Sequence, residues 1–303
     1  MLSSPLATEI VNGLFFSLVG GLIYGLYFSL IGLGLNLIFG VMRIVNLAHG
    51  DFLMLGAFAA YFAFEFLSAS PIVSALFVFA LFALLAFPLY YALVPRLLTA
   101  RDPEMLSIIL FFGLSQVIQA LATISFGTSE HSIPGRALAV GPMAILGQSF
   151  PKTWVISAGV SAVAVVGIYL YLYRTRIGYL TRAVMVHREE AVSTGIDVHR
   201  VSAIAFGIGL GLAAVAGVFA PFMLNVITPA MGVDVTITSF TVIVIGSLGN
   251  PLGTVLGGIL YGVSYMVMQR YLSSWANLLP YLVLIAVLLV RPSGLLGRQV
   301  RRA

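Results

Sequence analysis

The chain contains no cysteine, a single lysine (Lys152) and few charges of either sign. Without cysteine there is no disulfide, no thiolate nucleophile and no cysteine-based metal site. Charged residues make up only 8% of the sequence, whereas an average soluble domain has roughly 25%. A surface this poor in charge does not face water. The sequence therefore excludes a soluble globular protein.

Motifs for catalysis and for nucleotide binding are also absent. Lys152 follows Pro151 rather than glycine, so the chain has no phosphate-binding loop of the GxxxxGK[ST] kind. Neither HExxH nor GxSxG occurs, and the four histidines are far apart in the sequence. Only His49 and Asp51 come near each other, and two residues of separation place them on different sides of a helix. We expect neither an enzyme nor a cofactor or metal held by this chain.

Hydrophobic residues, by contrast, make up 60% of the sequence. Apolar runs long enough to cross a hydrocarbon core of about 30 Å recur along the whole chain, without the alternation of a β-barrel strand. The sequence predicts a single all-α polytopic membrane domain over 1–303, with about eight or nine membrane helices that include short or interrupted segments. The predicted spans are 13–40, 51–67, 71–95, 104–125, 153–173, 200–223, 237–248, 252–269 and 277–291.

The placement of arginine predicts the orientation. Arginines crowd the connection 174–200, the C-terminus and the connection around Arg96 and Arg101, whereas 126–152 carries only Arg136 and Lys152. The positive-inside rule then puts the N-terminus outside and the C-terminus in the cytoplasm of a cell (inner or cytoplasmic) membrane. It also accounts for the net charge of +5 without nucleic acid. The first twelve residues hold no Lys or Arg, so no cleavable signal peptide is expected.

Two apolar runs are interrupted by short polar motifs. NLAHG (Asn46–Gly50) follows one run and GNPLG (Gly249–Gly253) follows another. Corresponding interruptions in two halves of a chain are typical of an inverted-repeat transporter whose pathway lies between them. Glycines four residues apart favour close helix packing inside the chain; they are Gly21/Gly25, Gly207/Gly211, Gly253/Gly257 and Gly258/Gly262.

The first interruption gathers Arg43, Asn46, His49 and Asp51 within nine residues. An aspartate inside a membrane costs roughly 2.5–3.5 kcal/mol on insertion scales, so it faces protein, water or a partner charge. Two interpretations stay open. In the first, the polar side chains bond to backbone groups that the interruption leaves unpaired, and Asp51 caps a helix from Phe52 or pairs with Arg43 or His49. In the second, the cluster contacts a substrate. The candidates to line a pathway are Asn36, Asn46, His49, Asp51, Gln116, Gln119 and Asn250.

The connection 174–199 is too long for a simple turn. REEAVST (Arg188–Thr194) predicts a short helix, Gly195 ends it, and Asp197 suits an N-cap for the next span. Such a helix either fits a groove on a partner protein or lies on lipid headgroups. The residues alone do not decide between the two.

Four motifs carry a resemblance to a known family. GLNLIFGVMRIVNLAHGDFLMLGAF (34–58), RAVMVHREEAVSTGID (182–197), GSLGNPLGTVLGG (246–258) and RPSGLLG (291–297) occur in this order. Together they resemble the permease subunits of ABC importers for branched-chain amino acids, and the NLAHGDF motif resembles the H-type subunit.

The resemblance implies a function and a set of partners. It implies an ATP-driven importer of branched-chain or other neutral amino acids, with ATP and Mg bound by separate ABC ATPase subunits. The other partners would be an extracytoplasmic binding protein and a second homologous permease or a second copy of this chain. The short helix would be the coupling helix that docks on the ATPase through Arg188, Glu189, Glu190, Ala191 and Gly195. Urea, short amides or another small solute remain as alternative substrates, and an ion-coupled secondary transporter as an alternative class.

Overall fold

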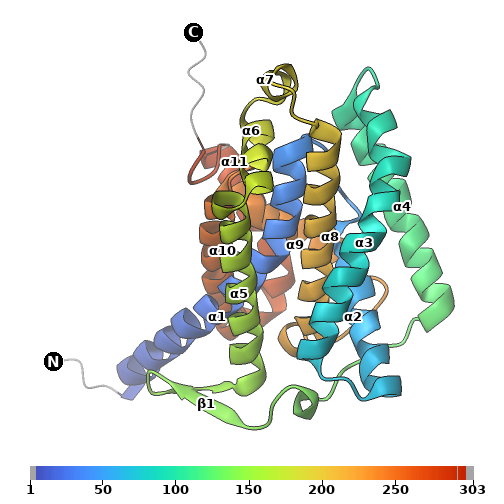
Figure 1. The fold of residues 1–303 in the computed structure, drawn as a ribbon. Coiled ribbons are helices and arrows are strands. Elements are labelled where there is room, and N and C mark those ends of the chain that lie inside the picture. The colour runs from blue at the N-terminus through green and yellow to red at the C-terminus, as the bar shows by residue number, and fades with distance from the viewer. Residues whose placement is uncertain (1–4, 292, 298–303) are drawn as a thin grey trace.

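The computed structural model describes residues 5–291 and 293–297 and folds as a bundle of α-helices (Figure 1). The first half contains α1 (Pro5–Met42), α2 (His49–Leu67), α3 (Pro71–Leu98), α4 (Pro103–Phe126) and α5 (Lys152–Arg174). A two-helix connection, α6 (Arg176–Val186) and α7 (Arg188–Ser193), leads to the second half. That half contains α8 (Val198–Met223), α9 (Met231–Gly246), α10 (Pro251–Tyr271) and α11 (Leu279–Val290).

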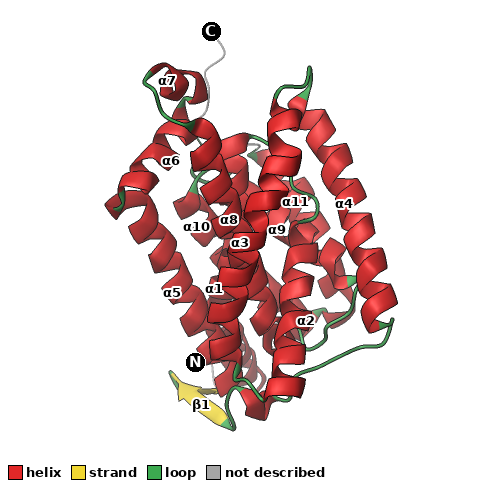
Figure 2. Cartoon of the chain, turned by 45° about the vertical axis from the view of Figure 1, so that its right-hand side comes forward, coloured by secondary structure: helices red, strands yellow, loops and turns green. Residues whose placement is uncertain are grey.

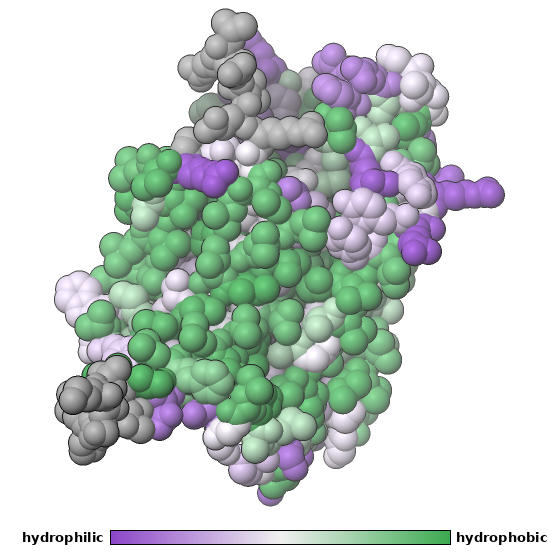
Figure 3. Space-filling model, turned by 90° about the vertical axis from the view of Figure 1, so that its left-hand side faces the viewer, coloured by the Kyte–Doolittle hydropathy of each residue, from purple (hydrophilic) through white to green (hydrophobic). Residues whose placement is uncertain are grey.

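Within the described residues, eight helical segments are long and apolar enough to cross a membrane, and α9 is a shorter apolar helix. A broad hydrophobic belt separates the polar ends of the molecule (Figure 3). The predicted all-α polytopic membrane fold is confirmed, and each predicted span corresponds to a helix. The main departure is at the seventh, where α9 begins at Met231 rather than near residue 237.

Helix starts follow their capping residues. Ser70, Asp102, Asp197 and Asn250 each accept a backbone N–H three residues further on. Three of these caps are followed directly by proline at the first helical position, where its missing N–H costs nothing. The predicted N-cap at Asp197 is confirmed.

One end of the molecule carries a small hairpin within the stretch 126–152, for which the sequence predicted no membrane helix. Strands β1 (Pro142–Ile145) and β2 (Gln148–Pro151) pair antiparallel at the end of the bundle opposite α7 (Figures 1 and 2). The side chain of Phe150 is buried and stacks on Phe16 of α1 with ring centroids 4.7 Å apart. The hairpin therefore covers the outer part of α1. A 3₁₀ turn, η1 (Gly135–Ala137), precedes it, and η2 (Ser273–Leu278) joins α10 to α11.

Glycines bring the long helices into backbone contact. A Cβ at Gly25 of α1 would meet Ile259 Cα of α10 at 2.6 Å, and one at Gly262 would collide with the backbone of Gly21 and Gly25. Gly207 and Gly211 likewise face α3. The predicted packing role of these glycine pairs inside one chain is confirmed.

The packing has the pattern of an inverted repeat. Helix α1 packs along α10 as α8 packs along α3, and α2 packs on α8 as α9 packs on α1. The sequence IGLGL occurs in both central helices, at 31–35 of α1 and 208–212 of α8. These helices run in opposite directions, because α1 ends and α8 begins at the end of the bundle that carries α7 (Figure 1). The architecture therefore supports the predicted repeat, with α1–α4 matching α8–α11.

The pairing of the two interruptions was wrong. In this repeat the counterpart of the NLAHG connection is 224–230, between α8 and α9, and the counterpart of the GNPLG connection is 68–70, between α2 and α3. The Ala-x-Gly sequence of Ala48–Gly50 recurs at Ala230–Gly232, at the start of α9. The two Asn- and Gly-containing motifs are alike in composition but not in position within the repeat.

Candidate functional site

The first turns of α2 and α9 meet deep inside the bundle. His49 Nε2 lies 3.1 Å from the carbonyl oxygen of Ile31, which precedes the end of α1 by eleven residues, about 16 Å at 1.5 Å per residue. The Gly50 N–H donates to Thr236 Oγ1 of α9 at 2.8 Å. Both helices therefore start within the membrane rather than at its surface. Short helices that start at this depth are typical of transporter binding regions.

A buried polar node lies at this junction. We use this name for Asn46, His49, Asp51 and Gln119, of which the first three are 0% exposed. The Gln119 side-chain amide of α4 donates to Asp51 Oδ1 and to Ser115 Oγ, both at 3.1 Å. Asn46 Oδ1 accepts the Ala48 N–H. The node therefore links the 43–48 connection, α2 and α4.

Three buried atoms of this node have no hydrogen-bond partner among the described residues: Asn46 Nδ2, His49 Nδ1 and Asp51 Oδ2. An unpaired buried polar group costs about 1–3 kcal/mol. A concentration of three such groups within six residues is typical of sites that bind a ligand or move.

The sequence interpretation of Asp51 needs correction. Helix α2 begins at His49, so Asp51 lies inside its first turn and does not cap a helix from Phe52. Within the described residues it forms no ion pair with Arg43 or His49, and its partner is Gln119. The Gly50 N–H in the first turn is accepted by Thr236 of α9, a contact that the local sequence does not contain.

Other predicted pathway residues lie at different places. Asn36 bonds only within the chain: its amide donates to the Asn250 carbonyl (2.9 Å) and to Thr254 Oγ1, and its Oδ1 accepts the Gly249 N–H at 2.5 Å. Asn250 caps α10. Both residues fix the connection between α9 and α10 against α1. Gln116 is exposed on α4 and does not join the node. Their roles in a pathway stay predictions.

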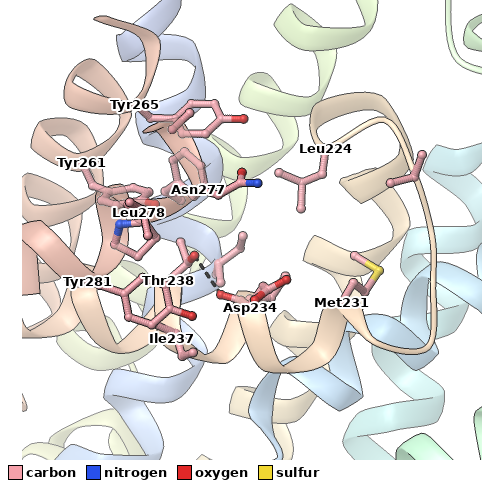
Figure 4. Close-up of a pocket in the computed structure, with 16 residues that line it drawn as sticks. Leu224, Met231, Asp234, Ile237, Thr238, Tyr261, Tyr265, Asn277, Leu278 and Tyr281 are labelled. Carbon is pink, nitrogen blue, oxygen red and sulfur yellow. Dashed lines mark hydrogen bonds between the residues drawn. The ribbon is translucent and has the colours of Figure 1, made fainter. Parts of the chain in front are cut away.

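A cavity that the sequence did not predict lies beside the node. It has a volume of about 540 Å³ and holds one carboxylate, Asp234 (Figure 4). Its walls come from α1, α9, α10, η2, α11 and the 224–226 segment. Ile31 lines it, and its carbonyl contacts His49 on the node side. Asp234 lay in a predicted loop because α9 begins without a side-chain cap. The only sequence signal was the Ala-x-Gly repeat just before it.

The connection between the two halves carries the short helix that REEAVST predicts, α7. Helix α7 ends as expected, because Gly195 adopts φ +83° and its N–H bonds to the Val192 carbonyl. Glu189 and Glu190 are exposed, whereas Ala191 is only 4% exposed and packs inside the chain. The outer face of α7 therefore includes Glu189, Glu190 and the apolar Val192, with Gly195 exposed in the turn that follows, whereas Ala191 faces the chain.

Two arginines tie this connection to the end of α1. Arg188 donates to the Val41 carbonyl, and Arg43 donates back to the Met185 carbonyl, both at 3.4 Å. Partial burial lowers the pKa of the Arg188 guanidinium, which nevertheless stays charged at physiological pH. Arg43 adopts φ +57°, a costly conformation for a residue with a side chain. The chain from Arg43 then leads directly into the polar node.

The fold is an inverted repeat in which α2 and α9 start inside the bundle, beside a buried polar node. The connection that carries α6 and α7 is bonded to the end of the central helix α1. These features are those of a multi-pass membrane transport protein. Residues 17–288 match the family model described as "Branched-chain amino acid transport system / permease component". The chain belongs to this family. No solved structure matches it.

Curated relatives agree with this assignment. The LivH permease protein of Salmonella typhimurium is 27% identical over 88% of this chain and 90% of the relative. BraD of Pseudomonas aeruginosa is 28% identical over 93% and 95% of the two chains, and the probable LivH of Methanocaldococcus jannaschii is 26% identical over 92% and 91%. The predicted resemblance to the H-type permease is confirmed.

The Asp51–Gln119 bond is open to a direct test. We expect Asp51→Ala and Gln119→Ala to show a coupling free energy of about 1 kcal/mol in a double-mutant cycle, the scale of hydrogen bonds between membrane helices. The free energy of unfolding, measured by detergent titration, supplies the four values. Gln116→Ala, on the exposed face of the same helix, is the matched control and should show no coupling to Asp51→Ala. Equal coupling free energies for both glutamines would show that Asp51 has no specific bond to Gln119.

Proposed function

We propose that this chain is the transmembrane subunit of an ATP-driven importer that moves branched-chain or other neutral amino acids across the cell (inner or cytoplasmic) membrane. The names of its relatives support the substrate class. The observation that carries the mechanism is the continuous connection from α7, through the Arg188–Val41 and Arg43–Met185 bonds, to the polar node. A push on α7 would then reach the place where α2 and α9 start.

The energy and the substrate would come from other proteins. As in ABC importers generally, ATPase subunits would bind ATP and Mg and dock on α7, and an extracytoplasmic binding protein would deliver the amino acid. A second homologous permease, or a second copy of this chain, would complete the pathway. The outer face of α7 offers Glu189, Glu190 and Gly195 for docking. Basic residues on the ATPase, opposite Glu189 and Glu190, would orient the two proteins and speed their association.

The same arrangement supports an orientation. Most arginines of the described connections, among them Arg96, Arg101 and Arg200, lie toward the end that carries α7 (Figure 1). We place this end in the cytoplasm and the β1–β2 hairpin outside. The terminal arginines Arg298, Arg301 and Arg302 lie outside the described residues.

The test is reconstitution of the chain in liposomes with candidate ATPase subunits, a second permease and a binding protein. We expect radiolabelled leucine uptake that requires ATP. Uptake driven by an ion gradient, without ATPase subunits, would contradict an ABC importer and favour a secondary transporter.

Charge reversal on α7 sharpens the same test. Glu189→Lys combined with Glu190→Lys should lower ATP-dependent uptake at least about tenfold, because two exposed contacts to the ATPase become repulsive. Glu104→Lys, an exposed acidic residue of α4 at the same end of the bundle, is the control and should retain uptake. Uptake by the double variant equal to that of the control would exclude α7 as the docking helix.

A further inference from the structure

The cavity beside the polar node has the size of a small-molecule site, since such pockets run from about 300 to 1,000 Å³. Its volume is about 540 Å³. Its walls combine an apolar part, including Phe28, Ile31 and Leu224, with a polar part that includes Thr238 and Asn277. A few polar groups in an apolar pocket are what orients a bound ligand.

The charge of the cavity is unbalanced. Asp234 is its only formally charged lining residue, and no Lys, Arg or His of the described chain lines it. Within the described residues Asp234 takes part in no salt bridge. The Asp234 side chain is exposed, so its carboxylate is open to water in the cavity. A cationic group of a ligand that enters the cavity therefore meets one carboxylate and no competing cation among the lining residues.

Donors for a negative group lie across the cavity. Figure 4 shows Asp234 on one side and Asn277, Tyr261 and Tyr265 on the other. An amide and phenol hydroxyls can donate to a carboxylate without adding charge. Thr238 is already committed, because its hydroxyl donates to the Asp234 backbone carbonyl at 2.9 Å. The arrangement separates one anionic group from neutral donors across an apolar space.

We propose that this cavity is a transit site for an amino acid zwitterion and that Asp234 accepts the α-ammonium group. Asn277 and the tyrosine hydroxyls face the α-carboxylate, and the apolar wall holds an aliphatic side chain. An acidic amino acid would place a second carboxylate in a cavity that has no cation to receive it. The inference rests on the proposed function and gives it a site.

The cavity also adjoins the node. A Cβ at Gly232 would collide with Asp51 Oδ1, and Gly232 lies two residues before Asp234 on α9. Movement at the start of α9 would thus change the cavity and the node together.

The experiment compares leucine moved per ATP hydrolysed in proteoliposomes that hold the complete importer. In the Asp234→Asn variant we expect this ratio to fall at least about tenfold, with ATP hydrolysis stimulated by loaded binding protein retained. Asp234→Glu should recover most of the ratio because the charge is kept. Glu65→Gln, an exposed carboxylate of α2 outside the cavity, is the matched control and should leave the ratio unchanged.

The outcomes separate the two proposals. If the wild-type importer moves no leucine with ATP, the proposed function fails. If it does and Asp234→Asn has the wild-type ratio, the transit site fails. Equal loss of uptake and of stimulated ATP hydrolysis would also overturn it, because Asp234 would then act in partner docking. If Asp234→Asn does not accumulate as a folded protein, Asn277→Leu on the opposite wall replaces it in the test. Its ratio of leucine moved to ATP hydrolysed should also fall at least about tenfold.

Discussion

Replacing Gly50 by alanine is expected to abolish transport and to destabilise the protein by about 3 kcal/mol or more. A Cβ at this position would collide with the Gly232 carbonyl and lie 2.5 Å from Thr236 Oγ1 and 2.7 Å from the Thr236 backbone nitrogen. These neighbours are mostly backbone and cannot rotate away. Helices α2 and α9 would be forced apart at the point where both begin, and the bond from the Gly50 N–H to Thr236 would be lost.

The measurement is the melting temperature in detergent, followed by size-exclusion chromatography, together with leucine uptake. Gly113→Ala is the matched control. Gly113 also lies inside a helix, but a Cβ there would meet nothing within 4 Å. The control should keep its uptake and gain up to about 1 kcal/mol from the better helix propensity of alanine. Wild-type melting and uptake in Gly50→Ala would show that the two helices do not meet at this glycine.

Removing both arginines that tie the connection to α1 is expected to uncouple the importer. In the Arg43→Ala/Arg188→Ala double variant, leucine uptake should fall at least about tenfold while ATP hydrolysis continues. The reason is that α7 would still carry its outer acidic face, but the Arg188–Val41 bond from α7 to α1 and the Arg43–Met185 bond from the end of α1 to α6 would both be lost. Either bond alone still joins the connection to the end of α1, so each single variant should lose less leucine uptake than the double variant.

Uptake and ATP hydrolysis are measured side by side in the same proteoliposomes. Arg200→Ala is the control, since Arg200 is exposed at the start of α8, near α7, and its side chain makes no hydrogen bond within the described chain. It should retain the wild-type ratio of leucine to ATP. A double variant with that same ratio would show that force does not pass through the arginine contacts.

The membrane helices could be predicted from the sequence because lipid imposes simple demands. A helix must be apolar over about 20 residues, and its first turn needs a cap. Runs such as 71–95 and caps such as Asp197 meet these demands locally, so the predicted and observed elements agree.

The start of α2 and the start of α9 could not be predicted in the same way. At the start of α2, the Gly50 N–H bonds to Thr236, which is 186 residues away, and the start of α9 has no capping side chain at all. Asp234 was consequently assigned to a loop. A local pattern does not record a hydrogen bond across the bundle.

The direction in which Ala191 points could also not be predicted from the sequence. A six-residue helix has too few positions for a hydrophobic period to mark its inner face. The outer acidic residues were identified, but the burial of Ala191 against its own chain follows only from how α7 folds back on α6 and α8. A test of docking therefore has to use Glu189 and Glu190, because a bulky residue at Ala191 would disturb the chain itself.

The crossing of α1 and α8 has a mechanical meaning. A Cβ at Gly34 would meet the Gly209 carbonyl at 2.5 Å, and a Cβ at Gly209 would meet the Gly34 carbonyl at 2.7 Å, so the two backbones touch with no side chain between them. The two central helices cannot approach further at this point. Beyond the crossing, toward the end that carries the hairpin, the Tyr27 and Tyr24 hydroxyls of α1 donate to the Ala216 and Met223 carbonyls of α8 at 3.1 and 2.8 Å. Helices α1 and α8 therefore form one rigid central unit that joins the two halves of the repeat.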